Sequence, residues 1–422
     1  MRWPTRTLGQ IATITGGSTP SRTQEEYWNG SILWLTPTDL PMPGKGIADV
    51  SDTAGKITEE GLAAISAQLL PVGTVLFSSR ATIGKLGISR LPLATNQGFA
   101  NFIPKNFVDA KYLAYCLLHY TAEITALAGS TTFKEVTKTA LKKFKIPLPA
   151  LSEQRRIVEI LDQADQLRKK RAEADAKAAR ILPALFYKMF GDPATNPKGW
   201  PIDVLSKLVK VQGGYAFKNA DFVEEGVLLV RIGNINCGEV VSTINSAHLP
   251  SFFCEEHTNY FIHNGDLLIA LTGATTGKLG RFWLKEPALL NQRVGRFQPL
   301  TKEKEIINYL HLFMETDYAQ NYIWQYARGF GQPNIAPRQI ESMLVPVPPA
   351  ELIHKFSVFC DKLIKKIKNH KPAKEKLETL YALLLHRAFI GDLTSKWREA
   401  HMKELLTEME TQAKALNVRM GS

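Results

Sequence analysis

The chain repeats itself once, and this repeat limits its possible folds more than any single motif does. The stretch ATIGKLG at 81–87 returns as ATTGKLG at 274–280. A period of about 195 residues is typical of a duplicated domain, because solenoid units are only about 20 to 50 residues long. Other pairs return in the same order: Trp3-Pro4 as Trp200-Pro201, Gly16-Gly17 as Gly213-Gly214, Asn96-Gln97 as Asn291-Gln292, and Pro147-x-Pro149 as Pro346-x-Pro348.

Each half has two parts, a β-rich region and a long helix. Short runs rich in Val, Ile, Thr, Phe and Trp, broken by Gly and Pro, predict strands and turns. One helix is expected inside each β-rich region, over 108–127 and 303–327. We therefore expect an α+β fold with these parts: a β-rich domain at 1–150, a helix at 151–192, a second β-rich domain at 193–349, a second helix at 350–395, and a short amphipathic tail at 396–422.

The two long helices carry matching heptad patterns. Counting from Ile157, eight of ten core positions are apolar in the first helix, and seven of ten are apolar at the same phase in the second. This pattern predicts an antiparallel coiled coil, although two unrelated helices that each cover their own domain are an alternative. The positions are Ile157, Ile160, Ala164, Leu167, Arg171, Ala174, Ala178, Ile181, Leu185 and Lys188, then Phe356, Phe359, Leu363, Lys366, His370, Ala373, Leu377, Leu380, Leu384 and Arg387.

Local signals refine these helices. Ser152 is the predicted N-cap of the first, and Glu153 lies in its first turn, where the helix dipole favours an acid. Pro183 and Pro372 are expected to kink or interrupt the helices, because proline lacks the N–H of the helical hydrogen bond. A helix of about 35 residues is roughly 50 Å long, which is on the order of 15 base pairs of duplex.

The positive charge is concentrated at equivalent places in the two halves. The net charge is +12, and residues 133–188 hold 14 Lys and Arg against 7 Asp and Glu. Residues 354–398 hold 11 against 4. Repeated basic segments are typical of a polyanion-binding protein, although a solvated basic helix would have the same composition.

The cysteines and the hydropathy favour a reduced, cytoplasmic setting. The four cysteines (Cys116, Cys237, Cys254 and Cys360) are scattered and form neither a disulfide framework nor a zinc motif. No apolar run is long enough to cross a membrane, and the first residues lack the apolar core of a signal peptide.

Familiar catalytic motifs are missing. GATTGKLG has three residues between Gly273 and Gly277 and Leu after Lys278, so it does not fit a phosphate-binding P-loop. The Asp-x-Lys pairs at Asp109 and Asp175 lack an upstream acidic partner, and neither GxSxG nor HExxH occurs. We therefore expect a non-catalytic chain without a metal or a cofactor of its own.

Four segments, with their counterparts in the second half, are the most specific parts of the chain: PLPALSEQRRIVEILDQAD at 147–165, WLTPTDL at 34–40, SSRATIGKLG at 78–87 and TNQGF at 95–99. With these segments, a β-rich module that occurs twice, each copy followed by a long basic helix, resembles the specificity subunit of type I restriction-modification enzymes. The resemblance covers the chain to about residue 395, and the second helix, which opens AELIHKFSVFCDKLIKK at 350–366, lacks the Ser-Glu-Gln-Arg opening of the first.

This resemblance implies a role and partners. Each β-rich domain would be a target-recognition domain that reads one half of a bipartite, gapped DNA sequence. The paired helices would set the gap and dock two adenine methyltransferase subunits, which restriction subunits join. S-adenosylmethionine, ATP and Mg would belong to those partners. A coiled-coil scaffold that binds protein without DNA specificity is the alternative, and an enzyme with an unrecognised site is a third hypothesis.

Polar residues on loops between the strands are the predicted DNA contacts, because base edges are read by hydrogen-bonding side chains while Lys and Arg hold phosphates. Residues that differ between the halves, Arg80 against Thr272 and Gly98 against Arg293, are the better candidates for specificity. The loops 18–22 and 215–219 and the residues Lys134, Lys138, Gln332 and Arg338 are further candidates. The predicted contacts are Thr36, Thr38, Asp39, Ser78, Ser79, Arg80, Thr82, Lys85, Asn96 and Gln97, then Arg231, Asn234, Thr272, Thr275, Lys278, Asn291, Gln292 and Arg293.

Residues shared by both halves also have a structural interpretation. The amides of Asn96 and Asn291 are equally well explained as caps of the backbone, and Gly84 and Gly277 as turn residues. Lys85 and Lys278 are expected to contact phosphate rather than bases.

Overall fold

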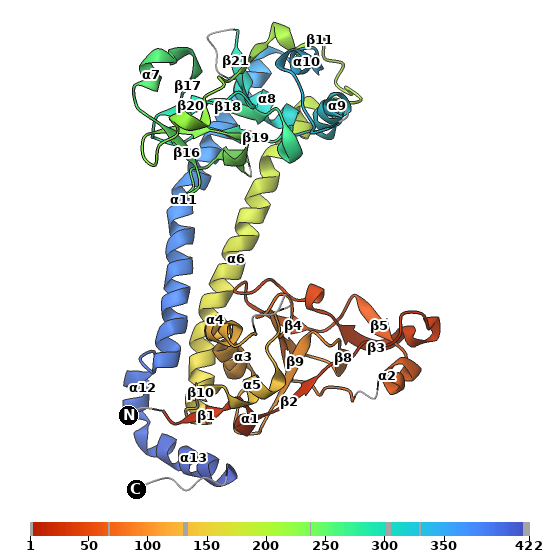
Figure 1. The fold of residues 1–422 in the computed structure, drawn as a ribbon, viewed down its shortest axis with the longest axis vertical. Coiled ribbons are helices and arrows are strands. Elements are labelled where there is room, and N and C mark those ends of the chain that lie inside the picture. Colours follow the sequence, from red (N-terminus) through yellow and green to blue (C-terminus); the bar gives the residue numbers. More distant parts are fainter. Residues whose placement is uncertain are drawn as a thin grey trace. The chain divides into compact units, whose positions relative to one another are not determined.

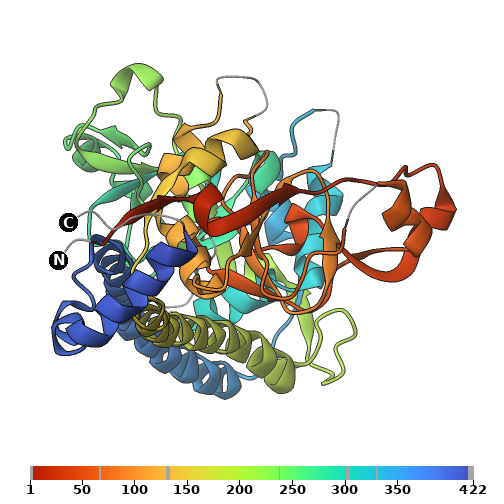
Figure 2. The same cartoon turned by 90° about the horizontal axis from the view of Figure 1, so that it is seen from below.

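The computed structural model divides into two compact units (Figure 1, Figure 2). The first unit combines Met1–Ala172 with Ala373–Ser422, and the second is Glu173–Pro372. Each long helix thus contributes one portion to each unit. The structure describes residues 3–65, 68–129, 134–236, 238–300, 305–328 and 331–416.

Three sheets build the β-rich part of the first unit. They have the strand orders β2-β9-β6-β7-β4, β5-β3-β8 and β1-β10. Val75, Phe77 and Phe102 of the largest sheet are fully buried, and they belong to one apolar core with Tyr112 and Leu113 of α3. The strands are β1 (Thr5–Thr7), β2 (Ala12–Gly16), β3 (Trp28–Leu35), β4 (Ile47–Val50), β5 (Gly55–Ile57), β6 (Val75–Ser78), β7 (Leu86–Ser89), β8 (Leu93–Thr95), β9 (Phe99–Pro104) and β10 (Lys145–Pro147), and the helices are α1 (Leu8–Ile11), α2 (Glu59–Ala64), α3 (Ala110–His119), α4 (Thr121–Ala126) and α5 (Lys138–Lys143).

The second unit repeats this topology. Its sheets have the orders β12-β21-β18-β19-β15-β14, β16-β13-β20-β17 and β11-β22. Strands β12, β21, β18, β19 and β15 correspond in order to β2, β9, β6, β7 and β4. The strands are β11 (Ile202–Val204), β12 (Val209–Gly213), β13 (Val227–Val230), β14 (Ile235–Asn236), β15 (Gly238–Val240), β16 (Ala247–Leu249), β17 (Phe261–Ile262), β18 (Leu267–Ala270), β19 (Leu279–Arg281), β20 (Ala288–Leu290), β21 (Val294–Pro299) and β22 (Leu344–Pro346), and the helices are α7 (Phe253–Glu256), α8 (Ile306–Met314), α9 (Asp317–Ala327) and α10 (Pro337–Glu341).

The helices expected inside the β-rich regions are present, each as a pair of shorter helices. The segment 108–127 forms α3 and α4, and 303–327 forms α8 and α9, with residues 303–304 outside the described part of the chain. The side chains of Asp109 and Thr316 cap α3 and α9 by accepting hydrogen bonds from N–H groups of the first turn. The carboxylate of Asp109 thus serves as a helix cap, which speaks against a nuclease-like role.

Both predicted long helices are present, α6 over Leu151–Phe190 and α11 over Ala350–Ile390. In the first unit the early part of α6 meets the late part of α11, where Arg168 bonds Glu378 at 2.7 Å. In the second unit the late part of α6 meets the early part of α11, where the rings of Phe186 and Phe356 lie 6.1 Å apart. These contacts confirm the antiparallel pairing.

The predicted heptad seam is only partly correct. Ile157 and Phe356 are fully buried, but Leu167 is 58% exposed and Leu380 is 50% exposed. Each portion of a long helix also covers the core of the unit to which it belongs, so the buried stripe is wider than a two-position seam and follows the 3.6-residue period. Pro183 and Pro372 lie inside continuous helices. Of the predicted kink or interruption, the interruption is therefore wrong.

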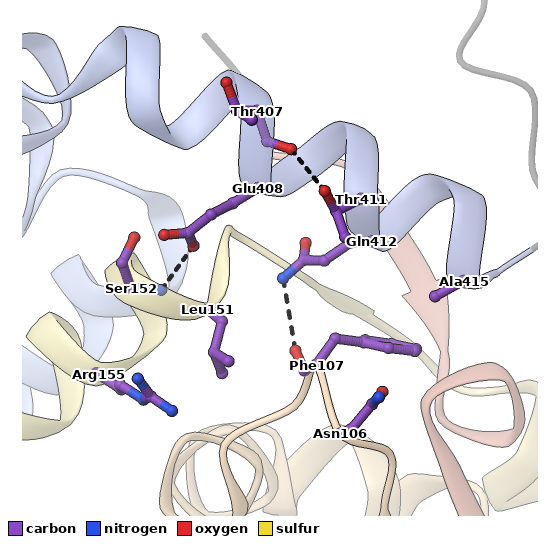
Figure 3. A pocket seen from close by; sticks show the side chains of 10 residues that line it. All are labelled: Asn106, Phe107, Leu151, Ser152, Arg155, Thr407, Glu408, Thr411, Gln412 and Ala415. Carbon is purple, nitrogen blue, oxygen red and sulfur yellow. Dashed lines mark hydrogen bonds between the residues drawn. The ribbon is translucent and has the colours of Figure 1, made fainter.

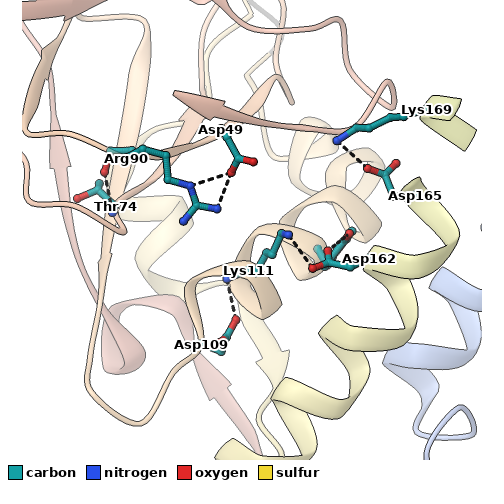
Figure 4. A network of polar contacts seen from close by, with 10 residues as sticks. Asp49, Thr74, Arg90, Asp109, Lys111, Asp162, Asp165 and Lys169 are labelled. Carbon is teal, nitrogen blue, oxygen red and sulfur yellow. Dashed lines mark hydrogen bonds and ion pairs between the residues drawn. The ribbon is translucent and has the colours of Figure 1, made fainter. Parts of the chain in front are cut away.

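Polar contacts join the β-rich part of each unit to the long helices, as Figure 4 shows for the first unit. In the first unit Lys111 of α3 pairs with Asp162 of α6 at 2.6 Å, and the Tyr115 hydroxyl donates to the same carboxylate. In the second unit Asn308 donates to Asp361 at 3.0 Å and accepts from Arg281 at 3.1 Å. Burial lowers the pKa of Arg281 to about 10. Both units thus join one helix of the β-rich part, α3 or α8, to a carboxylate of a long helix. The first unit uses an ion pair from Lys111, and the second uses a hydrogen bond from the neutral amide of Asn308.

The C-terminal tail packs on the beginning of α6 (Figure 1, Figure 2). It forms α12 (Ser395–Ala400) and α13 (Met402–Ala415). Its anchor is Glu153, which is only 2% exposed and accepts hydrogen bonds from Trp3 at 2.9 Å, Thr394 at 2.6 Å and Arg398 at 2.7 Å. The tail predicted at 396–422 is therefore helical and held against the first unit, and Leu405 of its apolar side is buried. Residues 417–422 lie outside the described range.

Ser152 does not have its predicted role as N-cap. The helix begins at Leu151, so Ser152 lies in the first turn, and its backbone N–H donates to Glu408 of α13 at 3.0 Å. Figure 3 shows this contact beside a cavity of about 370 Å³, which Gln412 and Phe107 also line. A carboxylate from the tail thus meets the positive end of the helix dipole.

Candidate nucleic-acid interface

Four loops of the first unit are held together at one end of its sheets by backbone hydrogen bonds. Ser18 N–H donates to Thr95 at 2.9 Å, and Asn96 N–H donates to Leu35 at 3.0 Å. Ser79 N–H donates to Gly98 at 2.9 Å. These bonds connect the segments after β2, β3, β6 and β8, which contain the predicted contact residues.

The second unit has the same arrangement. Tyr215 N–H donates to Leu290 at 2.9 Å, and Asn291 N–H donates to Val230 at 3.2 Å. Leu271 N–H donates to Arg293 at 2.9 Å. Every bond has its counterpart in the first unit, so the repeat is a repeated loop scaffold.

The double glycines allow the closest approach in this scaffold. A Cβ on Gly17 would lie 2.1 Å from the carbonyl oxygen of Thr95, and a Cβ on Gly214 would lie 2.2 Å from that of Asn291. Only glycine fits at such a distance. The second glycine of each pair therefore recurs because a backbone carbonyl of the neighbouring loop leaves no room for a Cβ.

The predicted contact residues separate by exposure. The half-buried members are used locally: Asp39 accepts from Thr36 N–H at 2.7 Å, and Asn96 accepts from Gly98 N–H at 2.9 Å. Thr36, Asp39, Asn96, Thr272 and Thr275 are half-buried, whereas Thr38, Arg80, Thr82, Gln97, Arg231, Lys278, Gln292 and Arg293 are exposed.

Five predicted contact residues are buried, namely Ser78, Ser79, Lys85, Asn234 and Asn291. The Lys85 ammonium donates to the Pro37 carbonyl, and the Ser78 hydroxyl donates to Thr82 at 2.6 Å. Asn234 accepts from Arg231 N–H at 2.9 Å and donates to Val241 and Ser246. These groups are occupied in holding the loops, so the expectation that Lys85 contacts phosphate is not supported by its position.

The structural interpretation of the shared amides and glycines agrees with the geometry. The Asn291 amide oxygen accepts from Arg293 N–H at 3.3 Å, as Asn96 does from Gly98. Gly84 and Gly277 have φ values of 97° and 83°, which favour glycine.

The positions expected to differ between the halves are structurally equivalent. Arg80 forms a β-bridge with Glu135, and Thr272 forms one with Asn334. The Arg80 guanidinium also donates twice to the Glu135 carboxylate, at 2.7 and 3.1 Å. Sequence reasoning missed Glu135, because 55 residues separate it from Arg80. In the second unit the arginine lies on the neighbouring loop, at Arg293, where the first has Gly98.

The remaining candidates lie beside these loops. Lys134, Lys138, Gln332 and Arg338 are exposed. Tyr215 is 41% exposed, and its ring centroid lies 4.4 Å from that of His257. In the loop after β2, Ser21 and Arg22 are exposed, whereas Pro20 is buried.

Among the described residues there is no cluster of three or more His, Cys, Asp or Glu that could hold a metal ion. Cys116, Cys254 and Cys360 are free thiols, and Cys237 lies outside the described ranges. In the part of the chain that the structure covers, none of the helices has the length and apolar character needed to span a membrane.

Comparisons with known proteins agree with the duplicated scaffold. Residues 2–175 and 197–379 both match the family described as type I restriction modification DNA specificity domain. The MjaIX specificity subunit of Methanocaldococcus jannaschii is 27% identical over 416 residues, which cover 93% of each chain. The EcoR124I/EcoR124II specificity subunit of Escherichia coli is 34% identical over 169 residues, which cover 38% of this chain and 41% of the relative.

Solved structures show the same fold. The crystal structure of the type I restriction-modification S subunit from M. genitalium has a TM-score of 0.56 and 15% identity, and covers 92% of this chain and 96% of that one. The two matches to the family model, one in each repeat, thus define the class as a two-domain DNA-specificity protein. The chain belongs to the family of type I restriction-modification specificity subunits, whose role is to recognise a DNA sequence, and its two matched domains fit a bipartite target.

Proposed function

We propose that the exposed residues of each loop scaffold read one half of a gapped DNA target. The observation that carries this proposal is the pairing of one repeated backbone arrangement with different exposed side chains. A shared backbone presents both sites to the same kind of ligand, and different side chains select different sequences. Arg80 and Arg293 are the strongest candidates, because a guanidinium can bond both acceptors of a guanine in the major groove.

Glu135 has a positioning role in this proposal. Its carboxylate holds the Arg80 guanidinium through two hydrogen bonds, while the Arg80 side chain remains 45% exposed. A guanidinium that is oriented before binding loses less side-chain freedom when it meets a base. Lys278 and Lys134 are exposed and would neutralise phosphates.

The chain acts in this proposal without chemistry of its own. Two adenine methyltransferase subunits would dock on α6 and α11, and restriction subunits would join them in the cytoplasm. S-adenosylmethionine, ATP and Mg would be bound by those partners. Support comes from the specificity-subunit family and from the exposed apolar residues of the helices, such as Leu167 and Leu380.

Methylation mapping tests the two-reader proposal. The chain is co-expressed with its methyltransferase subunit in a host without adenine methylation, and modified adenines are located across the genome. We expect one gapped motif with one methylated adenine in each half. Replacing residues 1–150 by those of a relative should change one half of the motif only, and a change in both halves would refute the assignment.

Single substitutions locate the reading residues. Arg80→Ala should lower the affinity for the preferred DNA target by about 10- to 100-fold, as expected for the loss of a bidentate base contact. The preference for one base at a single position of the first half-site should be lost with it. Arg90→Ala is the matched control. The Arg90 side chain is as exposed as that of Arg80 and pairs with Asp49 at 2.5 Å (Figure 4). It follows the end of β7, whereas the loop scaffold precedes the start of that strand. Equal effects of the two substitutions would contradict the proposed contact.

Salt dependence separates DNA recognition from a protein scaffold. Binding that neutralises phosphates must weaken steeply as salt rises, because condensed counterions are released. Lys278→Ala should reduce the slope by about one unit without changing the preferred sequence. Partner binding that is insensitive to salt, without DNA affinity, would instead support the scaffold alternative.

A further inference from the structure

A cavity of the first unit contains polar atoms that the fold itself does not satisfy. Its volume is about 340 Å³, and Thr15, Thr95, Asn101 and the segment 68–71 are among its lining. Asn101 is fully buried, and its amide nitrogen donates to the Thr95 hydroxyl at 2.8 Å. The amide oxygen of Asn101 and the buried hydroxyl of Thr15 have no hydrogen-bond partner within the described residues.

Buried polar atoms of this kind are uncommon, because an unmade hydrogen bond costs the full desolvation of the group. Asn101 is in the middle of a sheet and faces Thr15 across the β2–β9 pair. The oxygen is therefore fixed in place beside the cavity, where a ligand with an N–H donor would satisfy it.

The second unit provides an internal comparison at the same position. Gln212 and Arg296 are cross-strand partners of β12 and β21, as Thr15 and Asn101 are of β2 and β9. Arg296 is 6% exposed, and its guanidinium donates to the Gln212 amide oxygen and to the carbonyls of Asn259 and Phe261. In the second unit the protein thus supplies its own nitrogen donors to this place.

The cavity beside Asn101 and the equivalent position around Arg296 also differ in charge. Arg296 pairs with Asp266 at 3.2 Å, and the position before β6 that corresponds to Asp266 is Thr74. The lining of the first-unit cavity includes no charged residue. A cation would lose its hydration there without a counter-charge. An anion would bring acceptors to the unpaired acceptor of Asn101, which needs a donor. The ligand that fits is therefore neutral.

Size and location narrow the ligand class. The volume lies near the lower end of small-molecule sites, which is about 300 Å³. Leu70, Pro71 and Ile103 give apolar surface beside the polar atoms. Gly17 and Thr95 also line the cavity, and the adjoining Ser18 is bonded to Thr95 within the loop scaffold. The site thus borders the surface assigned to DNA.

We propose that this cavity binds a neutral heterocycle that carries an exocyclic amino group, the chemistry of an adenine or cytosine base. The amino group donates to the Asn101 amide oxygen, and the Thr15 hydroxyl bonds a second polar atom of the ring. The base comes either from solution or from bound DNA in which one nucleotide has left the stack, and only the second source rests on the proposed DNA function.

The first test uses free ligands and the full chain without DNA. 9-Methyladenine and 9-methylpurine differ only in the amino group, so calorimetric or ligand-detected NMR titration isolates its hydrogen bond. We expect 9-methyladenine to bind at least about tenfold more tightly, because the buried acceptor stays unpaired with 9-methylpurine. Equal binding of the two, or no binding of either, would overturn the proposal and leave only water in the cavity.

Substitutions place the binding in this cavity. Thr15→Val and Asn101→Leu should each remove most of the preference for 9-methyladenine. Thr13→Val is the control, because Thr13 is exposed on the same face of β2 but outside the cavity lining. Retained preference in both cavity variants would overturn the assignment.

A filled variant keeps the test decisive should Asn101→Leu fold poorly. The triple change Thr15→Gln, Asn101→Arg and Thr74→Asp copies the set Gln212, Arg296 and Asp266 of the second unit. It should fold, raise the melting temperature and abolish ligand binding. Undiminished binding of 9-methyladenine in this folded variant would refute the site.

DNA distinguishes the two sources of the base. 2-Aminopurine, which carries an exocyclic amino group, is placed in turn at each position of the first half-site, and its fluorescence is followed as the chain binds. A rise that the triple variant abolishes identifies a base extruded from DNA. Unchanged fluorescence with intact free-base binding identifies a base from solution. Failure of the DNA function itself would appear as loss of DNA binding with the free-ligand titration unaffected.

Discussion

The beginnings of the two long helices differ in sequence and in the contacts that they make. At the start of α6, Glu153 is buried and holds Trp3, Thr394 and Arg398 together. At the corresponding position α11 has Leu352, and the first-turn acid Glu351 is exposed. Both helices nevertheless continue for 40 and 41 residues.

This difference shows that the polar opening of α6 is not needed to start a helix. It is needed to hold the tail, since Glu153 joins the beginning of the chain, the first turn of α6 and α12 in one cluster. The second unit has no tail on its helix start among the described residues, and an apolar side chain takes the place of the acid. The Ser-Glu-Gln opening therefore marks the unit in which Trp3, Thr394 and Arg398 meet the start of a long helix.

The largest expected effect comes from making the first helix start like the second. Glu153→Leu leaves the Arg398 guanidinium, whose side chain is only 10% exposed, without its carboxylate. Removing one partner of a buried ion pair costs about 3–5 kcal/mol. We expect a loss of this size in urea unfolding, together with faster hydrogen exchange in α12 and α13, whereas Glu351→Leu on the exposed face of α11 should change stability by less than about 0.5 kcal/mol.

A double substitution sharpens this result. Glu153→Leu combined with Arg398→Met removes both charges, and apolar replacements of buried ion pairs are often neutral or stabilising. We expect the double variant to recover most of the lost stability. If it is as unstable as Glu153→Leu alone, the loss comes from packing around residue 153 and not from the unpaired guanidinium.

The glycines test what the two units share. A Cβ at Gly17 meets the Thr95 carbonyl oxygen at 2.1 Å, whereas at Gly16 the nearest atom, at 2.8 Å, is the mobile end of Lys138. Gly17→Ala should therefore cost about 3 kcal/mol, because backbone must move, and Gly16→Ala should cost less than about 0.5 kcal/mol. Gly214→Ala should match Gly17→Ala in thermal unfolding. A tolerated Gly17→Ala would mean that the loop scaffold is not built by this close approach.

Much of the fold could be predicted from the sequence, because the duplication repeats the five strands of the largest sheet and the long helix that follows each β-rich region. The heptad seam was less accurate, since periodicity alone does not show that Leu167 is turned to solvent while Ile157 enters the core of its own unit. The role of Glu153 as the anchor of the tail could not be predicted, for a different reason. Glu153 and Arg398 are 245 residues apart, and nothing local links them.

The candidate site could be predicted at the level of loops but not of side chains. The recurring segments lie on loops that backbone hydrogen bonds hold together in each unit. Spacing does not reveal, however, that Lys85 is directed inward to a carbonyl while Arg80 stays exposed. The unpaired oxygen of Asn101 follows from no local pattern either. It contrasts with the second unit, where Arg296 and Gln212 take the places of Asn101 and Thr15 and bond each other.

The smallest expected effect concerns pH and the pairing of the long helices. In the first unit a hydrogen bond from Arg168 lowers the pKa of Glu378. The corresponding positions of the second unit hold Ile367 and Ala179, which do not titrate. A lowered carboxylate pKa adds stability above the unfolded value, about 4.3, and this stability is lost as pH falls through the folded pKa. Glu378 is 51% exposed, so we expect less than about 1 kcal/mol.

Glu378→Gln should therefore lower stability slightly at neutral pH and flatten its decline between about pH 5 and pH 3. Glu375→Gln, an exposed substitution on the same helix, should leave the pH profile unchanged. Unfolding measured across this pH range compares the two variants with the parent chain. Because the effect originates in the first unit, hydrogen exchange should register it near Tyr381 and Arg168 and not near Phe356. A uniform change across both units would show that the acid dependence has another origin.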